Sequence, residues 1–191
     1  MRLLVSYLLT AVLAAVPARA QREIAYDDGT AERGIVYNER GNGLAVRFSA
    51  APGSILLGAR FFIAWAPFWN PLGVSVLRAN GPGDAPGDTL AGYFEERLDS
   101  RSRFKDVAFP APVALPGDFY VVYLQTGGGS GDSNVFGIDT SSPPDGRSWR
   151  FQNRAWTLMA PEEGDVMIRT ILSGRTPIAP SRWEEIKRLY R

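Results

Sequence analysis

Hydrophobic residues along this chain occur in short runs that are separated by Gly, Pro, Asn and Asp. In residues 44–48, Leu, Val and Phe alternate with Ala and Arg, and this period of two predicts a half-buried strand. Residues 119–125 are apolar or aromatic up to the final Gln, which favours a strand that is covered on both faces. We therefore predict that the stretch of residues 117–125 forms the central strand of a sheet.

Further strands are predicted at a regular spacing, with turn signals between them. They cover residues 23–26, 34–37, 55–65, 74–77, 90–96, 104–109, 135–139, 149–151, 156–158 and 165–172. Pro110, Pro112 and Pro116 are predicted to turn the chain into the central strand. In the last strand Val166, Ile168 and Thr170 alternate with Met167 and Arg169. The pattern predicts an all-β fold, an antiparallel β-sandwich of the jelly-roll type.

The first twenty residues have the pattern of a signal peptide. Arg2 precedes an apolar run over residues 3–16, and Pro-Ala-Arg-Ala at residues 17–20 fits an Ala-x-Ala cleavage site. The apolar run is shorter than the roughly 20 residues that a membrane-spanning helix needs. We expect export with cleavage of residues 1–20, no membrane span afterwards, and a secreted, periplasmic or cell-surface protein of a bacterium. Residues 21–174 are predicted to form one β-sandwich domain.

Residues 175–191 differ from the rest of the chain because they carry a helical pattern. Residues 176–180, Thr-Pro-Ile-Ala-Pro, predict a stiff, extended linker. Ser181 and Glu184 form a capping box, and residues 183–190 place Trp, Ile and Tyr on one face. We predict a short amphipathic C-terminal helix, which is marginal on its own and must dock on something.

The sequence contains no Cys and no His. Disulfides, thiolate metal sites and nucleophilic catalysis by Ser-His-Asp or Cys-His are therefore excluded. A glycosidase needs only two carboxyl groups, but Glu95 and Glu96 are adjacent and would face opposite sides of a strand. Gly-Asp-Ser at residues 131–133 lies in a Gly-rich loop without a base to activate Ser133, so it is predicted to be a turn. We predict that the chain is not an enzyme.

Basic and acidic residues nearly balance, with 21 Lys and Arg against 20 Asp and Glu. Loss of Arg2 and Arg19 with the signal peptide would leave 19 basic residues against 20 acidic ones. A nucleic-acid-binding protein would need a basic face or stripe, whereas the charges here are interspersed along the chain. Nucleic acid is therefore not an expected partner.

Three aromatic residues are candidates for ligand binding. Trp65, Phe68 and Trp69 lie in or beside a loop that is bounded by Pro67 and Pro71. Exposed rings in such a loop would form a platform on which a sugar ring or a partner side chain could stack. The competing interpretation places the three rings in the core. If the rings are exposed, the expected partner is a glycan or a protein at the cell surface.

Acidic residues gather at two places that a jelly roll could bring together. Asp27, Asp28 and Glu32 are close in sequence, and Asp165 opens the last strand. Because the terminal strands of jelly rolls often lie side by side, Asp27, Asp28 and Asp165 are candidate ligands of a structural Ca²⁺. The alternative is an acidic surface turn in which Asp28 accepts a backbone hydrogen bond. No other cofactor is expected.

Several segments together resemble a β-sandwich accessory domain of secreted bacterial proteins. They are residues 26–32 (Tyr-Asp-Asp-Gly-Thr-Ala-Glu), 41–48 (Gly-Asn-Gly-Leu-Ala-Val-Arg-Phe), 117–121, 137–140 and 164–169. The resemblance implies a domain that often lies beside peptidases or surface modules and that has no catalytic residues. We predict a secreted, non-catalytic binding module. The alternative is a structural or assembly subunit of a bacterial cell-surface or extracellular complex.

Deleting residues 180–191 should leave the β-domain folded, because every predicted strand ends before that segment. The melting temperature of the shortened protein should fall by less than about 4 °C, the shift that 1 kcal/mol produces in a domain of this size. Differential scanning calorimetry measures this shift. A large drop would show that the C-terminal helix completes the core.

Overall fold

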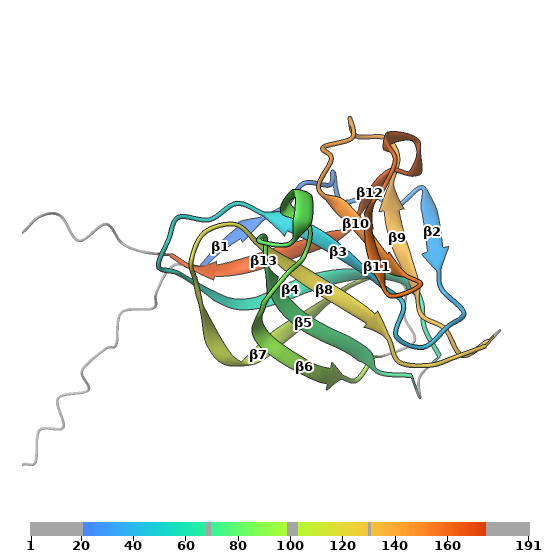
Figure 1. Cartoon of the computed structure of the whole chain (residues 1–191). Coiled ribbons are helices and arrows are strands. Elements are labelled where there is room, and N and C mark those ends of the chain that lie inside the picture. The colour runs from blue at the N-terminus through green and yellow to red at the C-terminus, as the bar shows by residue number, and fades with distance from the viewer. Residues whose placement is uncertain (1–20, 68–69, 99–102, 130, 175–191) are drawn as a thin grey trace, which may run out of the picture.

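The computed structural model describes residues 21–67, 70–98, 103–129 and 131–174. These residues form two antiparallel sheets that are stacked as the layers of a sandwich (Figure 1), as predicted. The described helical segments are the single turns η1 (Pro82–Asp84) and η2 (Pro161–Glu163), and none is long and apolar enough to cross a membrane. The predicted signal peptide, and the predicted linker and C-terminal helix, lie outside the described residues.

The strands divide into a seven-stranded and a six-stranded sheet. The first has the order β1 (Gln21–Ile24), β13 (Ile168–Ser173), β4 (Ser54–Trp65), β9 (Val135–Asp139) and β12 (Asp165–Val166), with β2 (Arg33–Val36) paired to β9 and β7 (Arg103–Leu115) paired to β4. The second has the order β11 (Ala155–Leu158), β10 (Ser148–Gln152), β3 (Gly43–Phe48), β8 (Phe119–Gln125), β5 (Leu72–Arg78) and β6 (Thr89–Glu96).

Strand β8 lies between β3 and β5 in the second sheet and pairs with both along its length. All of its residues are buried except Leu124, which is half-buried. Its inner side chains join the core between the sheets, and its outer side chains, Tyr120 and Val122, are covered by a second apolar cluster that includes Trp149. The prediction of a central strand with two covered faces is confirmed.

Aromatic side chains join the two sheets. The ring of Tyr123 from β8 lies 3.9 Å, centroid to centroid, from the ring of Phe136 in β9, and Phe61 of β4 packs edge-on against Phe136 at 6.4 Å. All three side chains are at most 1% exposed. Burial raises the pKa of the Tyr123 hydroxyl, which donates a hydrogen bond to the side chain of Gln125. These rings form the centre of the core.

Strand β7 is longer than predicted. The sequence suggested a turn at Pro110 and Pro112, but the strand continues to Leu115. The register between β4 and β7 shifts between Leu56 and Gly58, so residues 109–112 form an irregular stretch without paired residues on β4. A proline has no N–H to donate and is tolerated at such a bulge on an edge strand.

The predicted last strand is two strands, β12 paired with β9 and β13 paired with β4. Met167 lies between them, where its N–H donates to the Gly137 carbonyl and its own carbonyl accepts from the Phe62 N–H. Its side chain is fully buried, although the predicted alternation grouped it with the half-buried Arg169. The chain changes its neighbouring strand at Met167, and this resets the alternation.

Replacement of Phe136 by Ala should lower the free energy of unfolding by about 3–5 kcal/mol, because it opens a cavity between the two sheets. Leu158→Ala removes a side chain from a residue that is 45% exposed and should change the same quantity by less than about 0.5 kcal/mol. Urea unfolding followed by circular dichroism measures both. Equal effects would contradict the central position of Phe136.

Candidate functional site

Trp65 is the last residue of β4 and is 46% exposed. A register shift between Ile63 and Trp65 places it opposite Val135 of β9, and Val135 is also opposite Val36 of β2. Directly paired residues project from the same face of a sheet. Trp65, Val135 and Val36 therefore form an apolar row across three strand ends on the outer face of the first sheet, here called the Trp65 row.

Small residues make the surface beside the Trp65 row flat. A Cβ atom at Gly34 would lie 2.7 Å from a methyl carbon of Val135, and a Cβ atom at Gly137 would lie 2.5 Å from the ring of Phe62. Glycine is needed at both positions because the neighbouring side chains lie directly over the backbone. Phe62 in turn packs edge-on against Phe104 at 5.1 Å. The apolar surface thus continues from the row onto β4 and β7.

A polar network anchors the loop that follows Trp65. The buried Asn70 donates from its side-chain amide to the Asp132 carbonyl at 2.7 Å, and the Thr126 hydroxyl donates to the Pro71 carbonyl at 2.6 Å. This network ties residues 70–71 to the loop after β8. The predicted binding residues Phe68 and Trp69 lie outside the described residues, so only Trp65 of the predicted aromatic platform is placed.

Asp27, the first predicted metal ligand, forms an ion pair. Its carboxylate is 1% exposed and accepts hydrogen bonds from Nε and Nη2 of Arg169, and from the N–H of Gly29 at 3.0 Å. The Arg169 guanidinium also lies 4.3 Å from the ring centroid of Phe104. The carboxylate of Asp27 is therefore neutralised by a cation from β13, which leaves little need for a metal.

The carboxylates that do meet are those of Asp28, Glu32 and Asp139, whose oxygens lie within 4.8 Å of one another. Asp28 accepts from the N–H of Thr30 at 2.8 Å, which is an Asx-turn, and this bond together with the Thr30 hydroxyl lowers its pKa. Glu32 accepts from the N–H of Thr140 at 2.9 Å, which lowers the pKa of Glu32. The sequence indicated Asp28, but only the pairing of β2 with β9 brings Asp139 to it.

Asp139 already has several hydrogen-bond donors. Its two carboxylate oxygens accept from the N–H groups of Asp28, Ser141 and Ser142 and from the Ser141 hydroxyl, at 2.9–3.1 Å. Although burial opposes the charged form, these bonds hold the pKa of Asp139 well below its usual range. The cluster therefore joins the acidic turn to the end of β9 by hydrogen bonds that need no ion.

Asp165 lies opposite Asp139 in the pairing of β12 with β9 and is 4% exposed. The preceding Gly164 has a φ of 84°, and a Cβ atom there would lie 2.5 Å from the Asp139 carbonyl oxygen. Burial and the neighbouring Asp145 carboxylate raise the pKa of Asp165 to about 7. The structure thus separates the three predicted ligands: Asp27 pairs with Arg169, Asp28 joins Glu32 and Asp139, and Asp165 approaches Asp145.

The residues considered for catalysis have structural contacts. Ser133 is buried, and its hydroxyl donates to the Gly129 carbonyl at 3.2 Å within the loop after β8. Glu95 accepts a hydrogen bond from the Tyr93 hydroxyl, and Glu96 forms an ion pair with Lys105 at 3.5 Å. The contact of Ser133 fits the interpretation of residues 131–133 as a turn, and Glu95 and Glu96 each have a different partner.

Sequence reasoning missed a groove of about 600 Å³ between the edges of β6 and β7. Tyr93, Phe94, Phe109, Pro110 and Pro112 line it, and no charged side chain is among its described lining residues. Ligand sites usually combine an apolar lining with a few converging polar groups. The groove offers the apolar lining alone, and we do not assign it a ligand.

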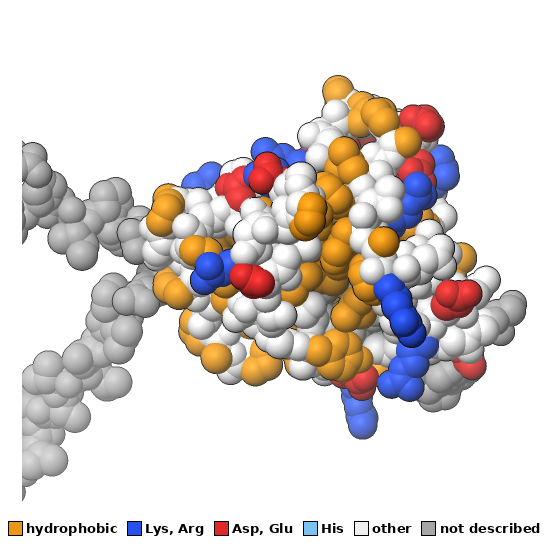
Figure 2. Space-filling view, viewed as in Figure 1, with side chains coloured by type: hydrophobic (Ala, Val, Ile, Leu, Met, Phe, Trp, Pro, Cys, Tyr) orange, Lys and Arg blue, Asp and Glu red, His pale blue; other side chains and the backbone are white. Residues whose placement is uncertain are grey.

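Charged side chains are distributed over the surface rather than gathered. Figure 2 shows Lys and Arg side chains interspersed with Asp and Glu on the viewed face, with hydrophobic side chains between them. Several charges of the described residues are paired, as in the bonds of Arg60 to Asp106 and Glu23, and of Arg150 to Glu163. This face therefore has no continuous basic stripe of the kind that follows a nucleic-acid backbone.

Comparison with known proteins relates the chain to parts of larger bacterial peptidases. No protein-family model matches it. Bacillopeptidase F of Bacillus subtilis (strain 168) is 32% identical in an alignment of 158 residues that covers 78% of this chain and 11% of that protein. The chain thus spans about a tenth of this relative.

Two solved structures of Cwp84 share the fold. The cysteine protease Cwp84 after propeptide cleavage has a TM-score of 0.63 at 14% identity, covering 80% of this chain and 40% of that chain. The cysteine protease and lectin-like domains of Cwp84, a surface layer associated protein of Clostridium difficile, have a TM-score of 0.59 at 13% identity and cover 80% and 36%. At these identities the likeness concerns the fold alone.

Chelation should leave the melting temperature unchanged, and millimolar Ca²⁺ added afterwards should not raise it. The reason is that hydrogen-bond donors already satisfy Asp28, Glu32 and Asp139. An ion that bound the native state alone would stabilise it in proportion to the logarithm of its concentration. Thermal unfolding with EDTA and then with a calcium series measures this. A rise with free Ca²⁺ would assign an ion to this cluster.

Proposed function

We propose that this chain is a non-catalytic binding module of a secreted bacterial protein, and that it binds glycans through the Trp65 row. The observation that carries the proposal is the pairing of Val36 with Val135 and of Val135 with Trp65, which exposes a flat apolar surface ending in an indole ring. Phe68 and Trp69 in the adjoining loop are proposed to extend this platform.

The chemistry of the surface favours a sugar ring as the ligand. An exposed, flat aromatic ring can stack on the apolar face of a sugar, while nearby polar groups bond to its hydroxyls. Monomeric proteins rarely leave large apolar residues side by side on their surface without a function.

The comparisons support this proposal at the level of context. The relative is named as a peptidase, and the matched region is a small part of its length. One of the solved structures with this fold includes a lectin-like domain beside a protease. We therefore propose three things together: an accessory role next to a catalytic domain, export from the cell, and binding at a bacterial surface. The resemblance noted in residues 26–32 and 41–48 supports the same context.

Trp65→Ala should weaken glycan binding at least about tenfold, a loss of roughly 1.4 kcal/mol of binding free energy. The ligand is first selected on an array of bacterial surface glycans, and its affinity is then measured by isothermal titration calorimetry. Because the Trp65 side chain is 46% exposed, the substitution should change the melting temperature little.

The matched control is Trp156→Ala, which removes the same side chain from β11 in the other sheet, where it packs against Phe151 at 4.9 Å. This variant should retain the affinity of the unmodified protein. If the array detects no glycan, or if the two variants lose affinity equally, the proposed sugar platform is wrong.

A further inference from the structure

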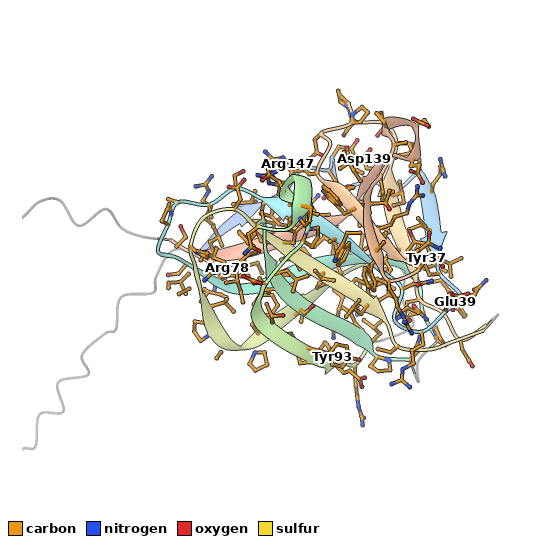
Figure 3. All side chains as sticks on the ribbon, in the orientation of Figure 1. Tyr37, Glu39, Arg78, Tyr93, Asp139 and Arg147 are labelled. Carbon is orange, nitrogen blue, oxygen red and sulfur yellow. The ribbon has the colours of Figure 1, made fainter. Side chains whose placement is uncertain are left out.

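A second recess lies away from the Trp65 row, at the end of the sandwich where Figure 3 shows Asp139 and Arg147. Its volume is about 350 Å³, and Asp145, Ser148, Leu158, Met159, Pro161 and Asp165 are among the residues that line it. We call it the Asp165 pocket. Its walls come from the loop before β10, from the end of β11 and from β12, so the packing of β10 against β11 and β3 shapes it.

The Asp165 carboxyl group neighbours Asp145, with whose side chain and N–H it forms hydrogen bonds, and it has no ion pair with a described Lys or Arg. The residue is 4% exposed, and its Oδ2 atom is buried without a hydrogen-bond donor. The facing Asp139 cannot supply one, because its carboxylate is itself an acceptor with its own set of N–H donors. A buried carboxylate is costly unless it is paired and hydrogen-bonded. The pocket thus contains a buried carboxylate oxygen that a hydrogen-bond donor, and above all a cationic one, would stabilise.

Arg147, which is paired with the neighbouring Asp145, does little to stabilise Asp165. Arg147 approaches Asp145, not Asp165, and its Nε lies 3.9 Å from the Asp145 carboxylate. Its guanidinium is also engaged elsewhere, 4.3 Å from the ring centroid of Tyr26 and bonded to the Arg47 carbonyl. Asp145 and Asp165 are therefore two neighbouring acidic side chains, of which Asp145 has the ion pair with Arg147.

The lining of the pocket favours an organic cation over a metal ion. Ca²⁺ requires six to eight oxygen ligands, whereas the side chains of the pocket offer two carboxylates and the Ser148 hydroxyl, which already accepts from the Val166 N–H at 2.9 Å. Leu158, Met159 and Pro161 present carbon atoms instead. Apolar walls beside two carboxylates suit an ammonium group on a carbon frame.

We propose that the Asp165 pocket binds a primary ammonium group, which lies against the carboxylates of Asp145 and Asp165 while its carbon frame packs on Leu158 and Met159. The ammonium has three donors for the two carboxylates. A lysine side chain and an amino sugar with a free amine both carry this group. The Asp165 pocket shares no residue with the Trp65 row, so the two sites can be tested separately.

The test is a titration of the isotope-labelled protein, purified from a secreting host, with four probes observed by NMR. Nα-acetyl-lysine methylamide and glucosamine carry the ammonium, while their N-acetylated counterparts, which are neutral at that nitrogen, do not. We expect saturable shifts of amides in residues 144–148 and 158–165 with a dissociation constant on the order of 1–10 mM for an ammonium probe, and none with its acetylated counterpart. The probe that binds identifies the source of the ammonium.

Asp165→Asn should weaken this binding at least tenfold, because it removes the buried charge with little change of shape. Glu162→Gln makes the same change of charge at an exposed neighbour of the pocket and should have no effect. Should Asp165→Asn fail to give a dispersed spectrum, Asp145→Asn serves in its place. The proposal is overturned if no ammonium probe saturates, if the acetylated probes bind equally, if both variants of the pocket keep full affinity, or if Ca²⁺ displaces the ammonium from these residues.

Discussion

The structure depends on the burial of β8 from both sides. A strand whose residues are apolar on both faces requires two layers of cover, and the seven-stranded sheet supplies one of them. The hairpin of β10 and β11 supplies the other layer, on the outer face of the six-stranded sheet. There Trp149 of β10 packs edge-on against Tyr120 of β8 at 6.1 Å. The hairpin of β10 and β11 is thus part of the fold, because without its rings β8 would expose an apolar face to water.

The two tyrosines of β8 also organise the polar parts of the molecule. A buried hydroxyl requires a partner. Tyr120 donates to the Asp84 carbonyl at 2.6 Å, which holds η1 over the sheet, and Tyr123 donates to Gln125. Gln125 in turn accepts from the Asn134 N–H at 3.3 Å. These bonds connect the loop after β8 to the central strand. Asn70, which bonds to that loop, connects the loop after Trp65 as well.

Much of this architecture could be predicted from the sequence, because strands with one or two covered faces have distinct patterns. The continuous run in residues 119–125 corresponds to β8, and the alternation in residues 44–48 corresponds to β3. The predicted half-burial of β3 is wrong, because Ala45 on its outer face is fully buried in the second apolar cluster, which the β10–β11 hairpin covers. Irregularities could not be predicted in the same way. The bulge in β7 at residues 109–112 and the change of partner strand at Met167 depend on the neighbouring strand rather than on local composition.

The candidate sites show the same limit. Proximity in sequence and the expected pairing of the terminal strands group Asp27 and Asp28 with Asp165 as ligands of one ion, but Asp27 faces Arg169 and Asp28 faces Thr30 and Ser141. In the sequence, Trp65 is a candidate ligand-binding residue because it lies beside a Pro-bounded loop. That it lies in one row with Val36 and Val135 follows from the register of β4 and β2 on β9, which no single strand encodes.

The proposed role of the Trp65 row can be examined most directly by mapping the bound glycan onto the protein. The measurement is a two-dimensional NMR titration that follows the indole N–H of Trp65 and the backbone amides of Val36 and Val135. The account predicts that these signals shift together and saturate with one affinity. Shifts confined to the groove lined by Tyr93 and Phe109, with the indole signal of Trp65 unmoved, would contradict it.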